Sequence, residues 1–316
     1  MDVSKIMMAD VCEEWLNMKR LLIKQSTYAK YRNIVERHIE PDIGDYNLGN
    51  LNSYLINSFI YEKIKKGRLD REGELAVKTV RDITTILKSI VKYAEKEYHT
   101  ENLAGNSVLP KRSRVKFEVL SLKEQKVMEE YLLDNLQEPR CVGLLICLYT
   151  GLRIGEICAL KWNNIDFESK SITITHTLQR ISMPDLETKR KTRIIIDEPK
   201  SESSFRTIPI PEKIFKIIRK SSYPHNDEDF FLTNSSKYVE PRNYQYFFRR
   251  TLKNMGIREV NFHILRHTFA TRCVEVGFDV KTLSEILGHA DTSITLNYYI
   301  HSSWENKQRQ MMLLEG

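Results

Sequence analysis

The sequence contains no long uninterrupted run of apolar residues. Hydrophobic residues make up 41% of its 316 positions, yet no stretch approaches the ~20 apolar residues that a membrane-spanning helix needs. The N-terminus also lacks the basic start and the apolar segment of a secretory signal. We therefore expect the chain to bury its apolar side chains in a core, to form two domains and to have no membrane partner.

The sequence also lacks the cysteine pattern of a disulfide framework. It has five cysteines, an odd number, and none forms a C-x-x-C pair. Such a set favours a reducing cytoplasm. Cys141, Cys147 and Cys158 lie in apolar segments with helical spacing, and we predict that they are core residues.

Acidic residues are outnumbered by basic ones. Lys and Arg total 49 against 42 Asp and Glu, which gives a net charge of +7 and a pI near 9.0. This excess fits a nucleic-acid partner but does not identify one, because many basic proteins bind no nucleic acid.

Residues 4–99 show almost no strand-like alternation, and their apolar residues recur at helical spacing. Ser26 or Thr27 is expected to cap the second helix, which Pro41 and Gly44 are expected to end. The region predicts a small helical bundle, with helices over residues 8–24, 27–44, 54–66 and 79–97.

Basic and aromatic residues gather at two places in this helical half. One cluster consists of Lys24, Tyr28, Lys30, Tyr31 and Arg32, and the other of Lys63, Lys65, Lys66 and Arg68. Lys and Arg supply the sequence-independent part of DNA affinity by contacting phosphates. A phosphate-contacting face and a solvent-exposed helix face both fit this pattern.

Helical periodicity is lost over residues 101–118. This segment holds Gly105, Pro110 and a set of basic residues, namely Lys111, Arg112, Arg114 and Lys116. We interpret it as a linker that lies against duplex DNA, between a first domain (1–100) and a second (119–316). A plain solvated tether is the alternative.

The second half mixes helices with short strands. Ser121 and Glu124 form a capping-box pattern ahead of an apolar helix. Residues 140–160 predict a buried helix, a break at Thr150-Gly151 and a new helix. Alternating β-branched segments predict a small antiparallel sheet, so that the fold class is α+β; these segments are 171–178, 193–197 and 206–210.

Charged residues in this half mark candidate functional positions. Arg153 stands at the helix break among apolar neighbours, where an unpaired guanidinium is costly to bury. A salt bridge to Glu156, three residues on, is one interpretation of it. Residues 211–256 are helical with interruptions, and Arg242 lies among their basic and aromatic residues as a candidate DNA contact.

The last part of the chain supplies imidazole, guanidinium and phenol groups in close succession. His263 and Arg266 share one face of a predicted helix, because positions i and i+3 are neighbours on a helix surface. A further helical run stops at Gly288, and His289 and Tyr299 follow it. This set of groups contains no carboxylate, so it suits an anion better than a metal.

Three motifs in this region resemble the C-terminal signature of the tyrosine recombinase (phage integrase) family: H-x-L-R at 263–266, L-G-H at 287–289 and Y-x-H at 299–301. The T-G-L-R-x-x-E context of Arg153 resembles that of the first arginine of the family. P-K-S-x-S-x-x-R-T-I-P at 199–209 resembles its β-hairpin, whose lysine is here Lys200. The helical half resembles the SAM-like core-binding domain, and residues 150–210, with their long hairpin, look closer to mobile-element integrases than to Xer proteins.

The resemblance implies that Tyr299 attacks a DNA phosphate and forms a 3′-phosphotyrosine. Tyr298 is the rival nucleophile, but only Tyr299 has a histidine two residues on. Arg153 and Arg266 are expected to bind the phosphate, because a guanidinium can fork two N–H donors onto its oxygens. His289 is expected to be a further donor.

The remaining roles follow from the same resemblance. His263 is the expected general base, since an imidazole titrates near neutral pH. Lys200 is the expected general acid for the leaving 5′-oxygen, and Glu156 supports Arg153 by orienting it. No metal and no cofactor are implied.

The implied partners are duplex DNA with specific recombination sites, a homotetramer on paired sites, and an accessory DNA-bending or directionality factor. The expected location is the bacterial cytoplasm, at the nucleoid when active. Integration, excision, inversion and dimer resolution all remain open, and a type IB topoisomerase or a catalytically silent DNA-binding protein are the alternative functions. A zinc site on His263 and His267 is a further alternative, although it lacks a neighbouring glutamate and a third ligand.

Overall fold

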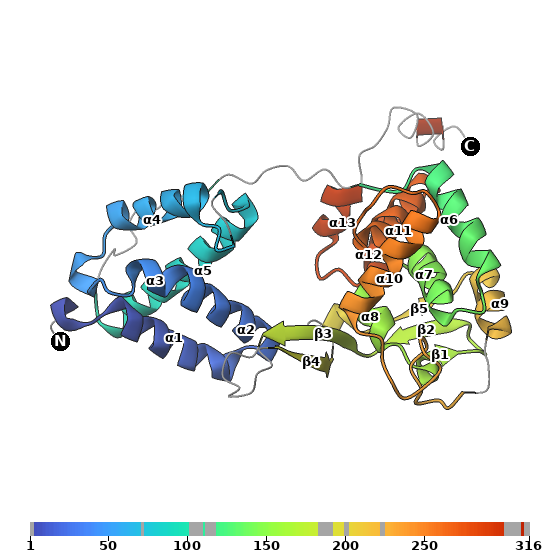
Figure 1. Ribbon diagram of the computed structural model, residues 1–316, viewed down its shortest axis with the longest axis horizontal. Coiled ribbons are helices and arrows are strands. Elements are labelled where there is room, and N and C mark those ends of the chain that lie inside the picture. Colours follow the sequence, from blue (N-terminus) through green and yellow to red (C-terminus); the bar gives the residue numbers. More distant parts are fainter. Residues whose placement is uncertain are drawn as a thin grey trace. The chain divides into compact units, whose positions relative to one another are not determined.

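A computed structural model describes residues 3–70, 73–100, 110, 118–182, 192–198, 202–221, 225–299 and 311–312 (Figure 1). Its contacts divide the chain into two compact units, Met1–Val115 with Ile181–Arg193 and Lys116–Arg180 with Ile194–Gly316. Most of the predicted linker, 101–118, lies outside the described residues, so the domain boundaries stay a prediction. No helix in the described part of the chain is long and apolar enough to cross a bilayer.

The first unit is a helical bundle around α5 (Val77–Glu97). Buried residues recur along α5 at helical spacing, at Val80, Ile83, Leu87, Ile90 and Ala94. This apolar stripe packs against α1, α2 and α4. The other helices of the unit are α1 (Met8–Leu22), α2 (Gln25–Ile34), α3 (Glu40–Ile43) and α4 (Ser53–Lys66), with 3₁₀ turns at Val3–Lys5 and Leu48–Asn50.

Two details of the predicted helix ends are wrong. The carbonyl of Lys24 accepts from the amides of residues 27 and 28, so α2 starts before Ser26 and Thr27 and neither side chain caps it. Pro41 does not end the following helix. A π-helical turn at Val35–Ile39 leads into α3, where the missing N–H of Pro41 lies at the helix start and costs little.

The second unit is built around α7 (Pro139–Thr150), which is apolar on nearly all sides and almost wholly buried. It contacts α6 (Leu122–Asp134), α9 (Glu212–Lys220) and α11 (His263–Glu275). The predicted capping box starts α6, because the Ser121 hydroxyl accepts from the Glu124 amide at 3.2 Å and the Glu124 carboxylate accepts from the Ser121 amide at 2.8 Å.

The remaining helices of this unit are α6 (Leu122–Asp134), α8 (Ile154–Ala159), α9 (Glu212–Lys220), α10 (Pro241–Asn254), α11 (His263–Glu275), α12 (Val280–Leu287) and α13 (Thr292–Tyr299), with 3₁₀ turns at Trp162–Asn164 and Glu202–Ser204. The predicted break at Thr150-Gly151 separates α7 from α8, and Arg153 is the N-cap residue of α8.

The strands in the described part of the chain form two small antiparallel sheets instead of one. β1 (Ile165–Asp166), β2 (Ser171–Ile174) and β5 (Arg206–Pro209) make a three-stranded sheet in the order β1-β2-β5, with Ile172 opposite Ile208. β3 (Thr177–Ser182) pairs with β4 (Thr192–Asp197). The predicted single strand 171–178 is therefore wrong, because the chain leaves one sheet after Ile174 and joins the other at Thr177.

Candidate functional site

The candidate site lies in the second unit, where α7 and α12 both end in a left-handed glycine. Gly151 follows α7 with a φ of 68°, and Gly288 follows α12 with a φ of 65°. Only glycine takes this conformation without steric cost. At these two turns the carbonyls at the helix ends are left without helical partners, and they accept hydrogen bonds from the arginines of the site.

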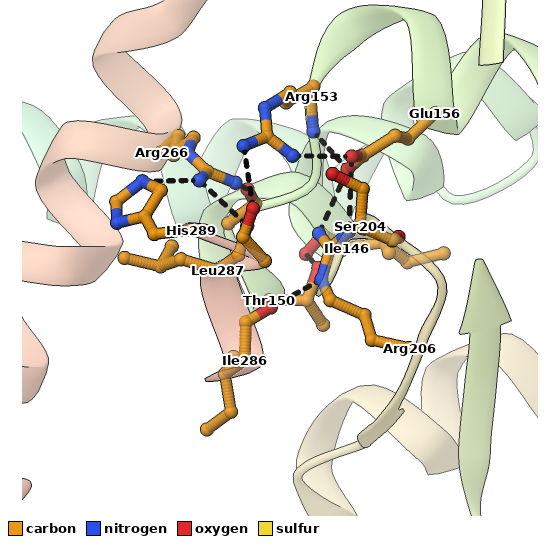
Figure 2. Close-up of polar contacts among 12 residues, drawn as sticks. Ile146, Thr150, Arg153, Glu156, Ser204, Arg206, Arg266, Ile286, Leu287 and His289 are labelled. Atoms are coloured by element: carbon orange, nitrogen blue, oxygen red, sulfur yellow. Dashed lines mark hydrogen bonds and ion pairs between the residues drawn. The ribbon is translucent and has the colours of Figure 1, made fainter. Parts of the chain in front are cut away.

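Three guanidiniums meet at the C-terminus of α12 (Figure 2). Arg206 Nε donates to the Ile286 carbonyl at 2.6 Å, and Arg266 Nη2 to the Leu287 carbonyl at 2.8 Å. Arg153 Nη2 donates to the Gly288 carbonyl at 3.2 Å. Three consecutive carbonyls thus receive three arginines from β5, α11 and the start of α8, at a helix end that attracts cations.

Arg266 is the most deeply buried of the three, at 3% exposure. Its Nη1 donates to the Gly151 carbonyl at 2.9 Å, so the side chain bridges the ends of α7 and α12. His263 lies one turn earlier on α11, as the spacing predicts, but it is exposed. The structure therefore brings together Arg153 and Arg266, which are far apart in sequence.

Glu156 is the carboxylate of the cluster, and it is 4% exposed. It accepts from Arg153 Nη1 at 2.7 Å, which confirms the predicted salt bridge, and from Arg206 Nη1 and Nη2 at 3.1 and 2.9 Å. Burial by itself would raise the pKa of Glu156, but the hydrogen bonds and charge of Arg206, followed by Arg153, lower this pKa to about 2. The carboxylate is thus ionised and holds two of the three arginines.

His289 connects the arginines to α13. Its Nε2 lies 2.8 Å from Arg266 Nη2, and its Nδ1 lies 2.8 Å from the hydroxyl of Thr295. A guanidinium can only donate, so Nε2 accepts and the ring proton lies on Nδ1, toward Thr295. Burial and the charges of Arg266 and Arg153 lower the pKa of His289 to about 3, so the ring is neutral at pH 7.

Two further histidines, His263 and His267 on α11, are also held neutral. Loss of hydration, followed by the charges of Arg266 and Arg153, lowers the pKa of His263. Loss of hydration, followed by the charge of His263, lowers the pKa of His267 to about 4, and its ring packs edge-on against His263 with centroids 5.8 Å apart. Among the described residues, no three His, Cys, Asp or Glu side chains gather as a metal site.

Tyr299 is the last residue of α13, and this helix packs against α11 and α12. Thr295, the partner of His289, is buried one turn before it on the same helix. The side chains of Tyr298 and Tyr299 are not among the described ones. Several predicted residues lie wholly outside the described part of the chain, namely Lys200, Lys111, Arg112 and Arg114.

The predicted DNA contacts that the structure describes are not all exposed. Lys24, Lys30 and Arg242 are exposed, whereas Tyr28 and Arg32 are half-buried. Lys30 pairs with Asp82 at 2.8 Å, and Arg32 pairs with Glu36.

Two further basic residues contact other side chains of their own domain. Lys63 is buried and pairs with Asp42 at 3.0 Å, so it is not part of an exposed basic face. On α10, Arg242 lies over the ring of Tyr246 and donates to its hydroxyl at 3.1 Å.

Sequence reasoning assigned no role to Arg206. The residue stands in the R-T-I-P segment that was compared only for its lysine, and alternation predicts a strand there without showing which residues are buried. The sequence did offer one signal for a role of Arg206: it is a charged residue next to strand-forming residues, in the same motif as Lys200. The role of Thr295 was missed too, because nothing in its local sequence marks it.

Known proteins share both the sequence pattern and the fold. Residues 122–306 match the phage integrase family, and residues 8–64 match the N-terminal SAM-like domain of phage integrases. A XerC-like tyrosine recombinase of Caldanaerobacter subterraneus subsp. tengcongensis is 26% identical, over 95% of this chain and 80% of that protein. The transposase of transposon Tn916 from Enterococcus faecalis is 28% identical, over 61% of this chain and 49% of its own length.

A solved structure of the Tn1549 transposon integrase in complex with a circular intermediate DNA has the same fold. Its TM-score is 0.76 at 22% sequence identity, and the match covers 98% of this chain and 100% of that chain. The family match alone spans more than half of the sequence. The chain therefore belongs to the phage integrase family and is a site-specific tyrosine recombinase, an enzyme that breaks and rejoins DNA strands.

Proposed function

We propose that this recombinase cuts duplex DNA at specific sites through a covalent 3′-phosphotyrosine bond to Tyr299. The Tyr299 oxygen attacks the phosphorus while the 5′-oxygen of the next nucleotide leaves. His263 takes the phenol proton, and Lys200 gives a proton to the leaving oxygen. Attack by another 5′-hydroxyl reverses these steps and rejoins the strand. No ATP is needed, because the covalent bond conserves the energy of the phosphodiester.

The observation that carries this proposal is the meeting of Arg153 and Arg266 at neighbouring carbonyls of the α12 end. The side chain of Arg153 is 32% exposed, so it can reach a ligand. Two guanidiniums side by side offer forked donors to the charge that develops on a five-coordinate phosphorus. Removing one such donor costs roughly 10²–10³ in rate.

The protonation of the histidines supports their proposed roles. His263 has a lowered pKa and is exposed, so at neutral pH its ring is unprotonated and accessible to a phenol proton. Nε2 of His289 accepts from Arg266, so it can donate to a phosphate only after taking up a proton. The negative charge of a phosphate favours that uptake, because an anion nearby raises the pKa of an imidazole.

We further propose that four copies act on two paired sites, as in the solved lambda integrase tetramer bound to a Holliday junction, which has a TM-score of 0.65 to this chain. Residues 1–100 would bind the core of each site, and residues 119–316 would carry the catalysis. Lys24, Lys30 and Arg242 are the described side chains that we place on DNA phosphates. We also propose that the enzyme acts in the bacterial cytoplasm, at the nucleoid where its DNA substrate lies, together with an accessory bending or directionality factor.

The experiment is a trap for the covalent intermediate. Purified protein is incubated with genomic DNA fragments, denatured, and recovered with any attached DNA, which is then sequenced. We expect a defined set of 3′-linked fragments, and we expect Tyr299→Phe to form none while binding the recovered duplex as tightly as the wild type.

Tyr298→Phe is the matched control, since it removes the adjacent phenol and should still form the adduct. An adduct from Tyr299→Phe that Tyr298→Phe lacks would move the nucleophile by one residue. Relaxation of supercoils by the wild type at many unrelated sequences, without strand exchange, would favour a topoisomerase instead.

A further inference from the structure

Arg206 is the one arginine of the three at the α12 end for which the mechanism has no use. It is 8% exposed, and its Nε, Nη1 and Nη2 all donate to protein oxygens. Nη1 also donates to the Ser204 carbonyl at 3.1 Å, in the turn before β5. All three of its nitrogens are therefore occupied by protein acceptors, namely the Glu156 carboxylate and the Ser204 and Ile286 carbonyls.

Those groups belong to two separate parts of the site. Nη1 and Nη2 donate side by side to the two oxygens of Glu156, and Glu156 in turn holds the guanidinium and the backbone amide of Arg153. Nε donates to the Ile286 carbonyl, immediately before the carbonyls that receive Arg266 and Arg153. Figure 2 shows this chain of contacts running from Arg206 through Glu156 to Arg153.

We propose that Arg206 is a positioning residue for strand cleavage: it fixes Glu156, which orients Arg153, and it fixes the end of α12, which holds Arg266 and leads into His289. This inference rests on the proposed roles of Arg153 and Arg266 at the phosphate. The planar guanidinium sets the directions of its donors relative to one another, so one rigid side chain aligns both parts. Lysine has no such fork.

The geometry of Gly288 shows how little room this arrangement leaves. A Cβ built on Gly288 would lie 3.0 Å from both Cδ and Nη1 of Arg206. The guanidinium therefore packs directly under the turn that carries His289. A shift of Arg206 moves either Glu156 or this turn, and a misplacement of about 1 Å at a catalytic group costs roughly 10²-fold in rate.

The test separates chemistry from binding and from stability. Single-turnover cleavage of the duplex recovered from the wild-type adduct is measured with saturating protein, and the Kd for the same duplex is measured separately. We expect Arg206→Gln to cleave roughly 10²-fold more slowly, with a Kd close to that of the wild type. Arg206→Lys keeps the charge but not the fork, so it should recover only part of the rate.

The pH profile of cleavage, expressed per amount of folded protein at each pH, is a second readout that separates this role from a loss of stability. Without Arg206, burial raises the pKa of Glu156 and fewer interactions oppose it. The acidic limb of the cleavage rate should therefore begin at a higher pH in Arg206→Gln than in the wild type. Arg206→Lys should bring this limb back toward the wild-type position.

Arg272→Gln is the matched control. Arg272 also donates to a carboxylate, Glu275, and to a backbone carbonyl, that of Leu120, but none of its partners belongs to the site. Its loss should lower stability and leave the cleavage rate of the folded protein unchanged. Should Arg206→Gln fail to fold, Arg206→Met combined with Glu156→Leu removes both buried charges, a change that is often neutral for stability; this double variant should fold and cleave slowly.

The inference is overturned if Arg206→Gln, or the double variant, cleaves as fast as the wild type. It is also overturned if the pH profile stays in place and the loss of rate follows the loss of folded protein, as for Arg272→Gln. A wild-type protein that forms no adduct would refute the proposed function itself, and this outcome is read before any variant is compared.

Discussion

At the level of single residues, the most unusual property of this site is the protonation of its histidines. His289 and His267 have pKa values lowered to about 3 and about 4, from an ordinary value of 6.5. In both cases loss of hydration comes first, and a neighbouring cationic or titrating group adds to it. The site thus keeps its imidazoles neutral beside its guanidiniums.

These values predict how stability depends on pH. Between pH 6.5 and about 4, the unfolded chain binds protons at His267 and His289 that the folded chain does not bind. The free energy of unfolding is therefore highest above pH 6.5 and falls as the pH is lowered through this window. Denaturant unfolding at a series of pH values measures the slope.

His289→Gln should flatten this slope, because glutamine does not titrate. The depressed pKa of Glu156 acts in a lower window, between 4.5 and about 2, and so does not obscure the effect near pH 6. A wild-type protein equally stable at pH 5 and pH 7, or a variant with an unchanged slope, would contradict the assignment of these protons.

Residue identity was predictable only where the local sequence carries the signal. Arg153, His263, Arg266 and His289 stand in recognisable motifs, and the structure brings Arg153, Arg266 and His289 into one cluster. Arg206 acts through Glu156 and Ile286, which are 50 and 80 residues away. A local pattern does not contain such partners, so this role could be found only in the fold.

Helix ends are the elements on which this site depends. Gly151 and Gly288 each end a helix in the left-handed region, and each carbonyl receives an arginine of the site. Gly256 lies one residue after the Met255 cap of α10 in the same conformation, with a φ of 67°, but nothing lies within 4 Å of a Cβ placed there. It is therefore a natural comparison for the other two.

Substituting alanine for each of these glycines separates the backbone strain of a left-handed residue from the steric clash of the added Cβ. Gly256→Ala should lower the free energy of unfolding by about 1 kcal/mol, the cost of a left-handed alanine, and leave cleavage unchanged. Gly288→Ala adds a Cβ 3.0 Å from Arg206, and Gly151→Ala adds one 2.8 Å from Leu287. Both should lose cleavage as well as stability.

Thermal unfolding and single-turnover cleavage of the three variants check this expectation. Equal cleavage rates for Gly288→Ala and Gly256→Ala would mean that the turn at α12 does not set the geometry of the site.

The predictability of the elements follows a similar division. The capping box at Ser121 and the break at Gly151 were predictable, because each depends on residues next to one another in sequence. The π-helical turn at Val35–Ile39 and the separation of β2 from β3 were not, since both depend on what the segment packs or pairs with.

At the scale of the whole molecule, the excess of basic residues is the feature that most affects DNA binding. A net charge of +7 favours association with a polyanion such as DNA, whatever its sequence. Affinity for duplex DNA should therefore weaken steeply with salt, by about 0.9 log units per log unit of salt for each phosphate contacted. Fluorescence anisotropy with a labelled duplex at several salt concentrations measures this slope.

Lys24→Gln should reduce the slope by about one phosphate contact. Lys170→Gln is the control, since Lys170 pairs with Glu212 at 2.8 Å in the second unit and we place it on no phosphate. A salt response that is flat for the wild type, or equal for both variants, would remove the predicted contact.

The use of backbone carbonyls at the end of α12 has an electrical consequence. Fixing three cations with three acidic side chains would cancel their charge and leave carboxylates to repel the incoming phosphodiester. Here one carboxylate, Glu156, pairs with Arg153 and Arg206, while Arg266 and the rest of the restraint depend on backbone carbonyls. The three guanidiniums are therefore held in place, and their cluster still carries two positive charges that no carboxylate balances.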